Sequence, residues 1–375
     1  MILARETCRQ RSSTLLVYFG STMLIMMFYI ASSYVNITED VIQNITGDTF
    51  VGDRLECKNN EGNGGVANYY LTDGGYASVR QSTFTKCESR YNGGAFSISI
   101  NFGSIFELIG LCYFQECKST SSTSPGSFGG GGAIYASIIQ PNSKFIIKDG
   151  VIFEYCSSHY QGGCLYLLAD LDGYVDINNA SLSYCSANEG GAIYSYSGIR
   201  SKQVLNKIRI ENCESKSGGG LFADIRIGGS VILDEQCEII NCSGSEGNGG
   251  GIYANINFTP QQCIFKINDA IIQYCKARFN SSLVYPTGYG GGLFICGSGN
   301  YNASTNYLDF HGLKIFNNSA DNKGQSMYIA IPKVAEWCQS GILGEYVKGN
   351  YNNKNSSLDD LYGIPIDLTQ FNASS

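Results

Sequence analysis

The chain has 375 residues, a net charge of −7, and 46 glycines against only 6 prolines, which excludes collagen-like and proline-rich disordered chains. Its 26 tyrosines outnumber its 25 lysines and arginines, and 43% of its residues are hydrophobic, so the composition favours a packed fold rich in strands. No basic cluster lies beyond the extreme N-terminus, and we therefore expect no nucleic-acid partner.

Residues 1–33 are typical of a targeting segment. Arg5, Arg9 and Arg11 precede an uncharged apolar run at 14–31, and small residues follow this run. The pattern predicts a signal peptide that is cleaved, with an uncleaved signal-anchor helix in the membrane as the alternative that the sequence leaves open. Either alternative sends the remaining chain through the secretory pathway to the cell surface or the extracellular space.

Asn-x-Ser/Thr sequons follow this segment, and in a secreted protein they are candidates for N-glycosylation. A chain so rich in Asn, Ser and Thr also forms such triplets by chance. The candidates that we favour are Asn36, Asn44, Asn179, Asn280, Asn302, Asn317 and Asn355. Further sequons stand at Asn241, Asn257 and Asn372.

A repeat of about 30 residues fills positions 51–331. The typical copy has an apolar residue three positions before a cysteine, and then Gly-Gly, a small residue, an aliphatic residue and an aromatic residue, while Cys57 begins the series less cleanly. The last copy carries Asn318 in place of the cysteine. The cysteines of the repeat are Cys57, Cys87, Cys117, Cys156, Cys185, Cys213, Cys242 and Cys275.

Alternating side chains give the fold that this repeat predicts. Aliphatic residues such as Ile134 and Leu165 lie two positions before another small or apolar residue, so both face the interior of the coil and the aromatic between them faces outward. The strands are short and no Asn-Gly turn joins two of them as a hairpin. We therefore expect an all-β, single-stranded, right-handed parallel β-helix of eight or nine coils.

The flanking segments complete the predicted organisation. We expect residues 34–50 to form an N-terminal cap, and residues 332–375 to form a final coil and a polar tail. The end of a solenoid exposes unpaired backbone and apolar core, so terminal repeats are usually modified in this way.

The repeat cysteines are expected to stack as a ladder inside the coils. Free cysteine behaves as a small buried hydrophobe, so a ladder of thiols is one interpretation. Disulfides in an oxidising compartment are the other. The chain has no Cys-x-x-Cys and only two histidines, His159 and His311, so we expect no metal site and no cofactor.

The outward aromatics form a second predicted column, for which two roles remain open. Stacked rings stabilise one another, and a contiguous rank of exposed rings can also bind glycans or a cell-surface protein. The members of this column are Tyr135, Tyr166, Tyr194, Phe222, Tyr253, Phe294 and Tyr328.

These motifs resemble a known family. The Gly-Gly-Ala-Ile copies at 131–134 and 190–193, with the Phe-x-x-Cys segments, resemble the GGA[ILV] and FxxN repeats of chlamydial polymorphic outer membrane proteins. They are also similar to right-handed β-helix repeat proteins of protist surfaces. The resemblance spans residues 50–330 and implies a β-helix, an adhesive role, and a ladder of asparagines where this chain has cysteines. Residues 332–375 lack the alternating strands that end the bacterial chains, so the export route is not implied.

The sequence therefore predicts a non-enzymatic protein of the cell surface or extracellular space, adhesive or structural. The alternative is a lyase or hydrolase that acts on polysaccharides, as in the pectate-lyase-like fold. Such enzymes bring carboxylates together in one groove. The pair Asp359-Asp360 lies beyond the repeats and Arg200-Ser201-Lys202 has no acidic pair beside it, which favours the non-enzymatic interpretation.

Overall fold

The structure is a computed structural model that describes side chains at residues 63–121, 129–339 and 360–374. Before residue 60 it describes only the backbone of strands. The predicted signal segment, the sequons at Asn36, Asn44 and Asn355, and Cys57 lie outside the residues with described side chains.

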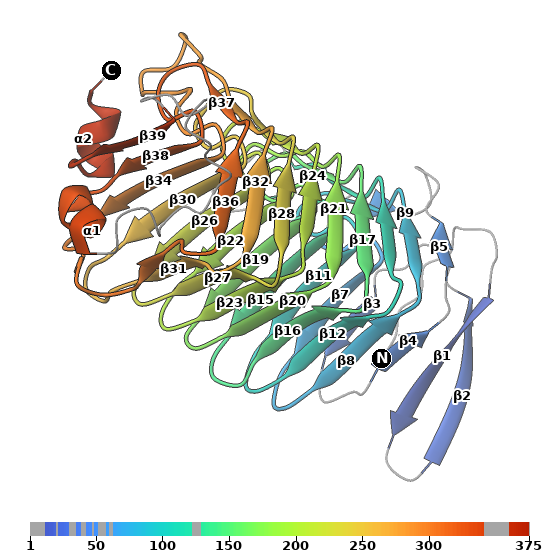
Figure 1. Ribbon diagram of the computed structural model, residues 1–375. Coiled ribbons are helices and arrows are strands. Elements are labelled where there is room, and N and C mark those ends of the chain that lie inside the picture. Colours follow the sequence, from blue (N-terminus) through green and yellow to red (C-terminus); the bar gives the residue numbers. More distant parts are fainter. Residues whose placement is uncertain are drawn as a thin grey trace.

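The chain folds as an all-β, right-handed parallel solenoid of about nine turns with almost no helix. Figure 1 shows the coils stacked along one axis, with the colour changing steadily from the N-terminal to the C-terminal end. The predicted parallel β-helix is confirmed, because each strand pairs in parallel with the equivalent strand of the next coil.

Three long sheets form the sides of the solenoid, and we call them sheets A, B and C. Sheet A contains β4 (Gln43–Thr46), β8 (Tyr76–Arg80), β12 (Ile105–Ile109), β16 (Lys144–Lys148), β20 (Tyr174–Asn178), β23 (Lys202–Asn206), β27 (Ser230–Asp234), β31 (Ile264–Ile267) and β35 (Leu308–Asp309). Sheet B contains β3 (Val35–Thr38), β7 (Ala67–Leu71), β11 (Phe96–Ile100), β15 (Ile134–Ile139), β19 (Leu165–Asp170), β22 (Ile193–Ser197), β26 (Leu221–Arg226), β30 (Ile252–Asn257), β34 (Leu293–Ser298), β38 (Met327–Ala330) and β39 (Leu361–Ile364). Sheet C contains β5 (Thr49–Val51), β9 (Thr83–Thr85), β13 (Tyr113–Gln115), β17 (Val151–Glu154), β21 (Ala180–Ser183), β24 (Arg209–Glu211), β28 (Cys237–Ile240), β32 (Ala270–Gln273) and β36 (Leu313–Phe316).

Two-residue strands follow the repeat cysteines and form two shorter sheets at the next corner. The first contains β6 (Lys58–Asn59), β10 (Glu88–Ser89), β14 (Lys118–Ser119) and β18 (Ser157–Ser158). The second contains β25 (Glu214–Ser215), β29 (Ser243–Gly244), β33 (Lys276–Ala277) and β37 (Ser319–Ala320).

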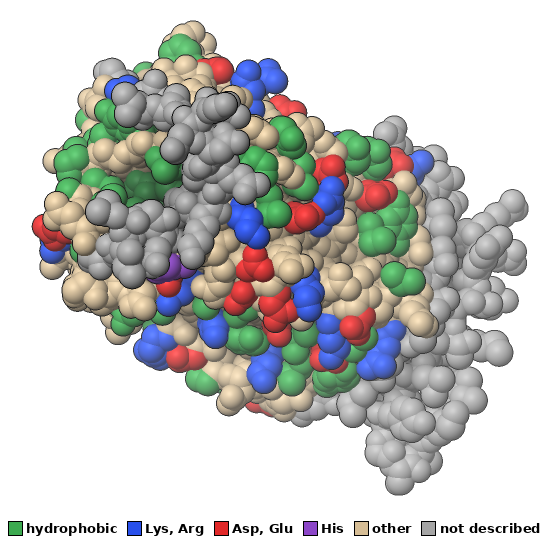
Figure 2. Space-filling model, in the orientation of Figure 1, with side chains coloured by type: hydrophobic (Ala, Val, Ile, Leu, Met, Phe, Trp, Pro, Cys, Tyr) green, Lys and Arg blue, Asp and Glu red, His purple; other side chains and the backbone are tan. Residues whose placement is uncertain are grey.

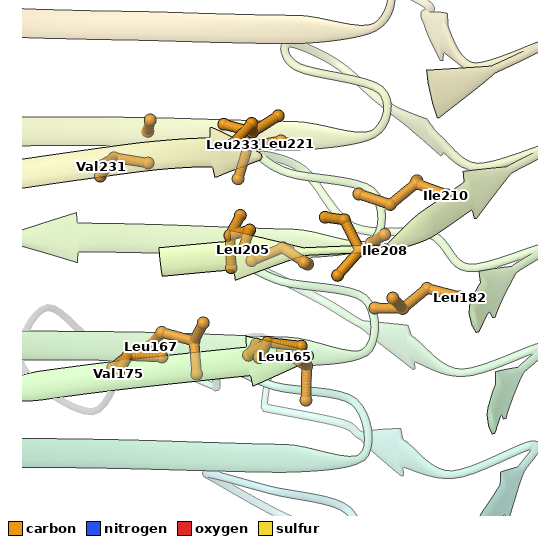
Figure 3. Close-up of a cluster of buried hydrophobic side chains, with 14 of the residues drawn as sticks. Leu165, Leu167, Val175, Leu182, Leu205, Ile208, Ile210, Leu221, Val231 and Leu233 are labelled. Carbon is orange, nitrogen blue, oxygen red and sulfur yellow. The ribbon is translucent and has the colours of Figure 1, made fainter. Parts of the chain in front are cut away.

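The interior is filled by the aliphatic side chains that the repeat places every second residue. Figure 3 shows three successive coils contributing side chains to one continuous core, with Leu165 and Leu182 from one coil and Leu205 and Ile210 from the next. Each of these side chains is fully buried. Burial of apolar surface contributes roughly 25 cal/mol per Å², so each coil is stabilised mainly by its neighbours.

The Gly-Gly pairs make the corner before sheet B. Gly93, the first of one pair, has a φ of +63°, which residues with a side chain rarely adopt. A Cβ on the second, Gly94, would overlap the carbonyl oxygen of Gly132 in the next coil. The first glycine therefore supplies the turn, and the second allows the coils to approach each other.

The N-terminal segment adds a hairpin and a set of strands to this solenoid. Strands β1 (Ser12–Phe19) and β2 (Thr22–Tyr29) pair as an antiparallel hairpin, and β3, β4 and β5 pair in parallel with β7, β8 and β9. The predicted signal or anchor helix is therefore not confirmed. Among the residues that the structure describes, no helix combines the length and the hydrophobicity needed to cross a bilayer.

The C-terminal segment contains two short helices that the sequence analysis did not predict. These are α1 (Val334–Ser340) and α2 (Leu368–Asn372), and β39 between them extends sheet B beyond β38. Trp337 of α1 is buried and its Nε1 donates to the carbonyl oxygen of Leu308, while Phe371 of α2 is buried against sheet B. Both helices thus cover apolar surface at the end of the solenoid.

Candidate functional site

The predicted aromatic column runs along the outer face of sheet B. Its members are register partners in successive strands, from Tyr135 opposite Tyr166 to Phe294 opposite Tyr328, and Tyr362 of β39 extends it. Neighbouring rings stack with centroid separations from 4.5 Å, between Phe222 and Tyr253, to 5.7 Å. The parallel register alone brings these rings together, as predicted.

The predicted exposure of this column is wrong for four of its rings. Tyr194, Phe222, Phe294 and Tyr328 are buried, and the remaining rings are half-buried. The physical reason is the stacking itself, because each ring covers the faces of its neighbours. At the C-terminal end Phe371 adds a further contact, with its ring centroid 5.3 Å from that of Phe294. The column is therefore a stack of aromatic rings on the outer face of sheet B, and mainly the edges of these rings are exposed to solvent.

Two carboxylates flank this column, and the sequence analysis missed both. Asp224 is buried on β26, where it pairs with Arg226 and accepts a hydrogen bond from Asn255. Glu189 precedes a Gly-Gly corner and accepts a hydrogen bond of 2.7 Å from Gln161 Nε2. Burial raises the pKa of the Glu189 carboxyl, the hydrogen bond from Gln161 lowers it in part, and the charge of Asp224 raises it further.

Exposed aromatic rings lie elsewhere, at the corner between sheet C and the repeat cysteines. Tyr155 and Tyr184, each 50% exposed, stack with centroids 4.9 Å apart and an interplanar angle of 11°. Tyr274 is 55% exposed at the same corner of a later coil. We call the residues at this corner the corner ladder. Its described members are Lys86, Glu116, Tyr155, Tyr184, Asn212, Asn241, Tyr274 and Asn317.

Every member of the corner ladder has a left-handed backbone. The φ angle is 55° at Tyr155, 55° at Tyr184 and 58° at Tyr274. Backbone hydrogen bonds hold this conformation, since the N–H of Tyr155 donates to Ser183 and the N–H of Tyr184 donates to Glu211 in the next coil. A left-handed conformation costs an L-residue about 1–2 kcal/mol, and glycine and asparagine adopt it most readily.

The surface beside the two stacked tyrosines is rich in hydroxyl groups, and the exposed Lys118 and Glu214 are the register partners of two of its serines. Ser183 directly precedes Tyr184, and Ser157 and Ser186 lie two positions after the two rings and pair in a parallel bridge. None of these three serines is buried. The site therefore combines ring edges, phenol groups and aliphatic hydroxyls.

Charged groups of sheet C near this surface are engaged with partners. Tyr113 donates a hydrogen bond of 2.5 Å to Glu154, and burial followed by this hydrogen bond raises the pKa of Tyr113 to about 12. In the next coils Arg209 pairs with both Glu211 and Glu238. Figure 2 shows Lys and Arg interleaved with Asp and Glu over the face that carries sheets A and C. No charge of one sign thus dominates around the tyrosine pair.

A simple signal in the sequence marks the corner ladder, namely the residue directly before each repeat cysteine. The repeat analysis used only the cysteine and the apolar residue three positions before it. The left-handed backbone of the residue directly before each cysteine becomes apparent only when Asn212, Asn241 and Asn317 are aligned with the tyrosines. Asparagine at several equivalent positions is the expected trace of positive φ.

The repeat cysteines form the predicted internal ladder, and all those with described side chains are buried. Their thiols bond to the previous coil, as Cys117 Sγ does to the carbonyl oxygen of Phe84 at 3.5 Å. Asn318 takes the same place, because its Nδ2 donates to the carbonyl oxygen of Ile272 at 3.0 Å. The asparagine and the cysteines are therefore equivalent rungs of one ladder.

One rung also forms a disulfide. Cys185 is bonded to Cys164, which follows the Gly-Gly pair of the previous coil. The remaining repeat cysteines with described side chains are free, so the thiol ladder and the disulfide, which the sequence left as alternatives, occur together. Cys156, Cys164 and Cys185 are all buried, and their sulfur atoms lie within 4.8 Å of one another.

The glycosylation candidates with described side chains differ in accessibility. Asn179, Asn302 and Asn317 are exposed, and Asn280 is half-buried. Asn179 and Asn317 have left-handed backbones, with φ angles of 60° and 54°. Their glycosylation stays a prediction. Exposure gives an attached glycan room at three of the four positions.

Comparisons with protein-family models, with curated proteins and with solved structures find no match for this chain.

Proposed function

We propose that this chain is a non-enzymatic protein of the cell surface or extracellular space, adhesive or structural, that binds neutral glycans at its corner ladder. The observation that carries the proposal is the stacked and exposed pair Tyr155–Tyr184 in a left-handed backbone. The stacked column of sheet B supports the solenoid in this account, and the exposed pair provides the binding surface. Residues 1–33 supply the secretory signal or the membrane anchor.

The local physics of the solenoid does not favour tyrosine at these corners. Asparagine at Asn212 and Asn241 suits the same backbone, and Asn241 Nδ2 donates to Asn212 Oδ1 at 2.6 Å. The left-handed conformation costs a tyrosine about 1–2 kcal/mol of free energy, and half of the side-chain surface stays exposed to water. Strained, exposed residues that the surrounding structure holds in place are characteristic of functional positions.

The surroundings of the pair favour a neutral sugar over other ligands. Exposed aromatic side chains contact the apolar C–H groups of sugars, and nearby hydroxyls exchange hydrogen bonds with them. Ser157, Ser183 and Ser186 supply such hydroxyls, and Glu154 and Arg209 of sheet C are held by partners within the sheet. An acidic polysaccharide or a nucleic acid would need a cluster of basic groups, whereas the exposed Lys118 lies beside Ser157 with the acidic Glu116 in the same coil.

Binding of the purified chain to an array of immobilised neutral and acidic oligosaccharides tests the proposal. We expect binding to neutral oligosaccharides, lost in the double variant Tyr155→Asn/Tyr184→Asn. Asparagine already occupies this corner in two neighbouring coils, so the variant keeps the fold. Tyr274→Asn is the matched control, since this tyrosine has the same backbone but neighbours that are not tyrosine, and it should bind as wild type. Unchanged binding by the double variant would contradict the proposal.

A second candidate function rests on Glu189 and Asp224. Their carboxylates are close enough for the charge of Asp224 to raise the pKa of Glu189, and Arg226 pairs with Asp224. Glycoside hydrolysis uses a pair of carboxyl groups, one of which donates a proton. Activity on polysaccharides that Glu189→Gln abolishes, with binding at the corner ladder retained, would favour this enzymatic alternative.

A further inference from the structure

The three sulfur atoms of Cys156, Cys164 and Cys185 form a triangle inside the solenoid. Cys156 and Cys185 are successive rungs of the internal ladder. Cys164 approaches from the side, because it follows the Gly-Gly corner of the coil to which Cys156 belongs. All three side chains are buried in the apolar core. The proposed glycan surface uses none of them, so this inference does not depend on the proposed function.

This triangle occurs once among the described coils, because only one of them has a cysteine, Cys164, directly after its Gly-Gly pair. The position after Gly-Gly faces the ladder residue of the next coil, and a Cβ at Gly251 would lie 3.2 Å from Cys275 Sγ. Cys164 makes the equivalent contact with Cys185. The other described coils hold residues without sulfur at this position, namely Val66, Ala95, Ala133, Ala192, Gly220, Gly251, Gly292 and Ser326.

We propose that these three cysteines, when reduced, bind one soft, thiophilic metal ion of the Cu(I) class, and that the Cys164–Cys185 disulfide is the oxidised, metal-free form of the same site. Thiolates are the ligands that select Cu(I) among the metals available to proteins. Zn²⁺ prefers four ligands in structural sites. Among the described His, Cys, Asp and Glu side chains, no fourth joins this group.

An external dithiol can act as the reductant that converts the Cys164–Cys185 disulfide into the reduced site. Two electrons and two protons from the dithiol break the S–S bond and give the thiols of Cys164 and Cys185, while the dithiol becomes a disulfide. Binding of the ion then replaces the three S–H protons, which pass to solvent. The ion binds thiolates and therefore has to displace these protons, so its affinity should fall as pH decreases.

The burial of the cluster determines how the site is filled. All three cysteines are buried in the closed coils. We expect the ion to enter while the chain folds, as in other metal sites that form together with the fold. The experiment therefore refolds the full chain in the presence of the ion.

The chain is refolded anaerobically with excess phosphine reductant and Cu(I) supplied as its acetonitrile complex, then desalted against a Cu(I) chelator, and the copper per chain is measured. The matched variant is Cys164→Ala, which places here the alanine of two neighbouring coils. We expect wild type to retain about one more Cu(I) per chain than this variant. Cys237→Ala, which removes a buried thiol outside the cluster, should retain as much as wild type. Equal retention by wild type and Cys164→Ala would overturn the proposal.

X-ray absorption at the copper edge and a redox comparison complete the test. The extra ion should have three sulfur neighbours and no nitrogen or oxygen neighbour, and its release should increase as pH is lowered. Wild type refolded without reductant should keep the disulfide and lack the extra ion. If the oxidised chain holds the same ion, these three sulfurs are not its ligands. Far-ultraviolet circular dichroism on each variant confirms the strand content.

Discussion

The backbone N–H of Cys275 donates a hydrogen bond of 2.9 Å to Oδ1 of Asn318 in the next coil. The same kind of contact joins two cysteines, because the N–H of Cys185 points to Cys213 Sγ at 3.4 Å. A thiol and a carboxamide can therefore serve as the same rung, each accepting from one backbone group and donating to another. The carboxamide makes the shorter bonds, since oxygen and nitrogen are smaller and more polar than sulfur.

Replacing Asn318 by alanine should destabilise the C-terminal coils. The change leaves the N–H of Cys275 and the carbonyl oxygen of Ile272 without these partners, and a buried group that loses its partner costs about 1–3 kcal/mol. The free energy of unfolding, from urea titration followed by circular dichroism, measures the loss. Asn318→Cys is the matched variant and should lose clearly less, because cysteine fills this place in the other coils. An equal loss in both variants would show that the rung has no hydrogen-bonding role.

Tyr274→Asn should stabilise the chain. Tyr274 has a φ of 58°, and its ladder neighbours are Asn241 and Asn317, so no tyrosine stack is lost on substitution. Relief of the left-handed conformation should raise the free energy of unfolding by about 1 kcal/mol. Urea unfolding of the variant and wild type provides the measurement. A lower stability would mean that the exposed ring makes contacts that offset its backbone strain.

Glu189→Gln should change how stability depends on pH. Burial raises the pKa of Glu189 above its ordinary value of 4.5, so over that interval the folded chain binds a proton that the unfolded chain has released. The stability contributed by this group is complete below about pH 4.5 and decreases as pH rises through the raised pKa.

The glutamine variant is neutral and can still accept the hydrogen bond from Gln161. It should be more stable than wild type at pH 7, and the difference should disappear near pH 4. Thermal unfolding midpoints measured across this range give the comparison. Glu214→Gln removes an exposed carboxylate and should give no such pH-dependent gain. A glutamine variant that is less stable at pH 7 would mean that the ionised carboxylate is needed in the fold.

The repeat predicts the coil because its chemistry is local and periodic. Alternating aliphatics such as Ile134 and Ala136 place themselves in the core, and Gly93 and Gly94 allow the corner between strands. Each coil then meets a nearly identical one, so the register needs no long-range information. The sequence spacing alone thus predicts the parallel pairing, the internal cysteine ladder and the stacked column of sheet B.

The exposure of a side chain depends on the groups that cover it, and the repeat pattern does not predict those groups. Phe222 alternates outward as predicted, yet the rings of Tyr194 and Tyr253 bury it on both sides. Phe371 joins the column from a helix that has no counterpart in the repeat. The exposed pair Tyr155–Tyr184 was missed for the opposite reason, since a left-handed corner turns the ring away from the coil.

The central claim is that residues about 30 positions apart lie one coil apart in exact parallel register, and Tyr155 and Tyr184 allow a direct test without any substitution. Their exposed rings stack at 4.9 Å, so brief photo-oxidation should join them as dityrosine within one molecule. Tandem mass spectrometry of the digested chain identifies the linked peptides. The account predicts a Tyr155–Tyr184 link that disappears in urea and no link from Tyr274 to either ring. Absence of that link in the folded chain, or a link from Tyr274 to Tyr155 instead, would contradict the stacked coils.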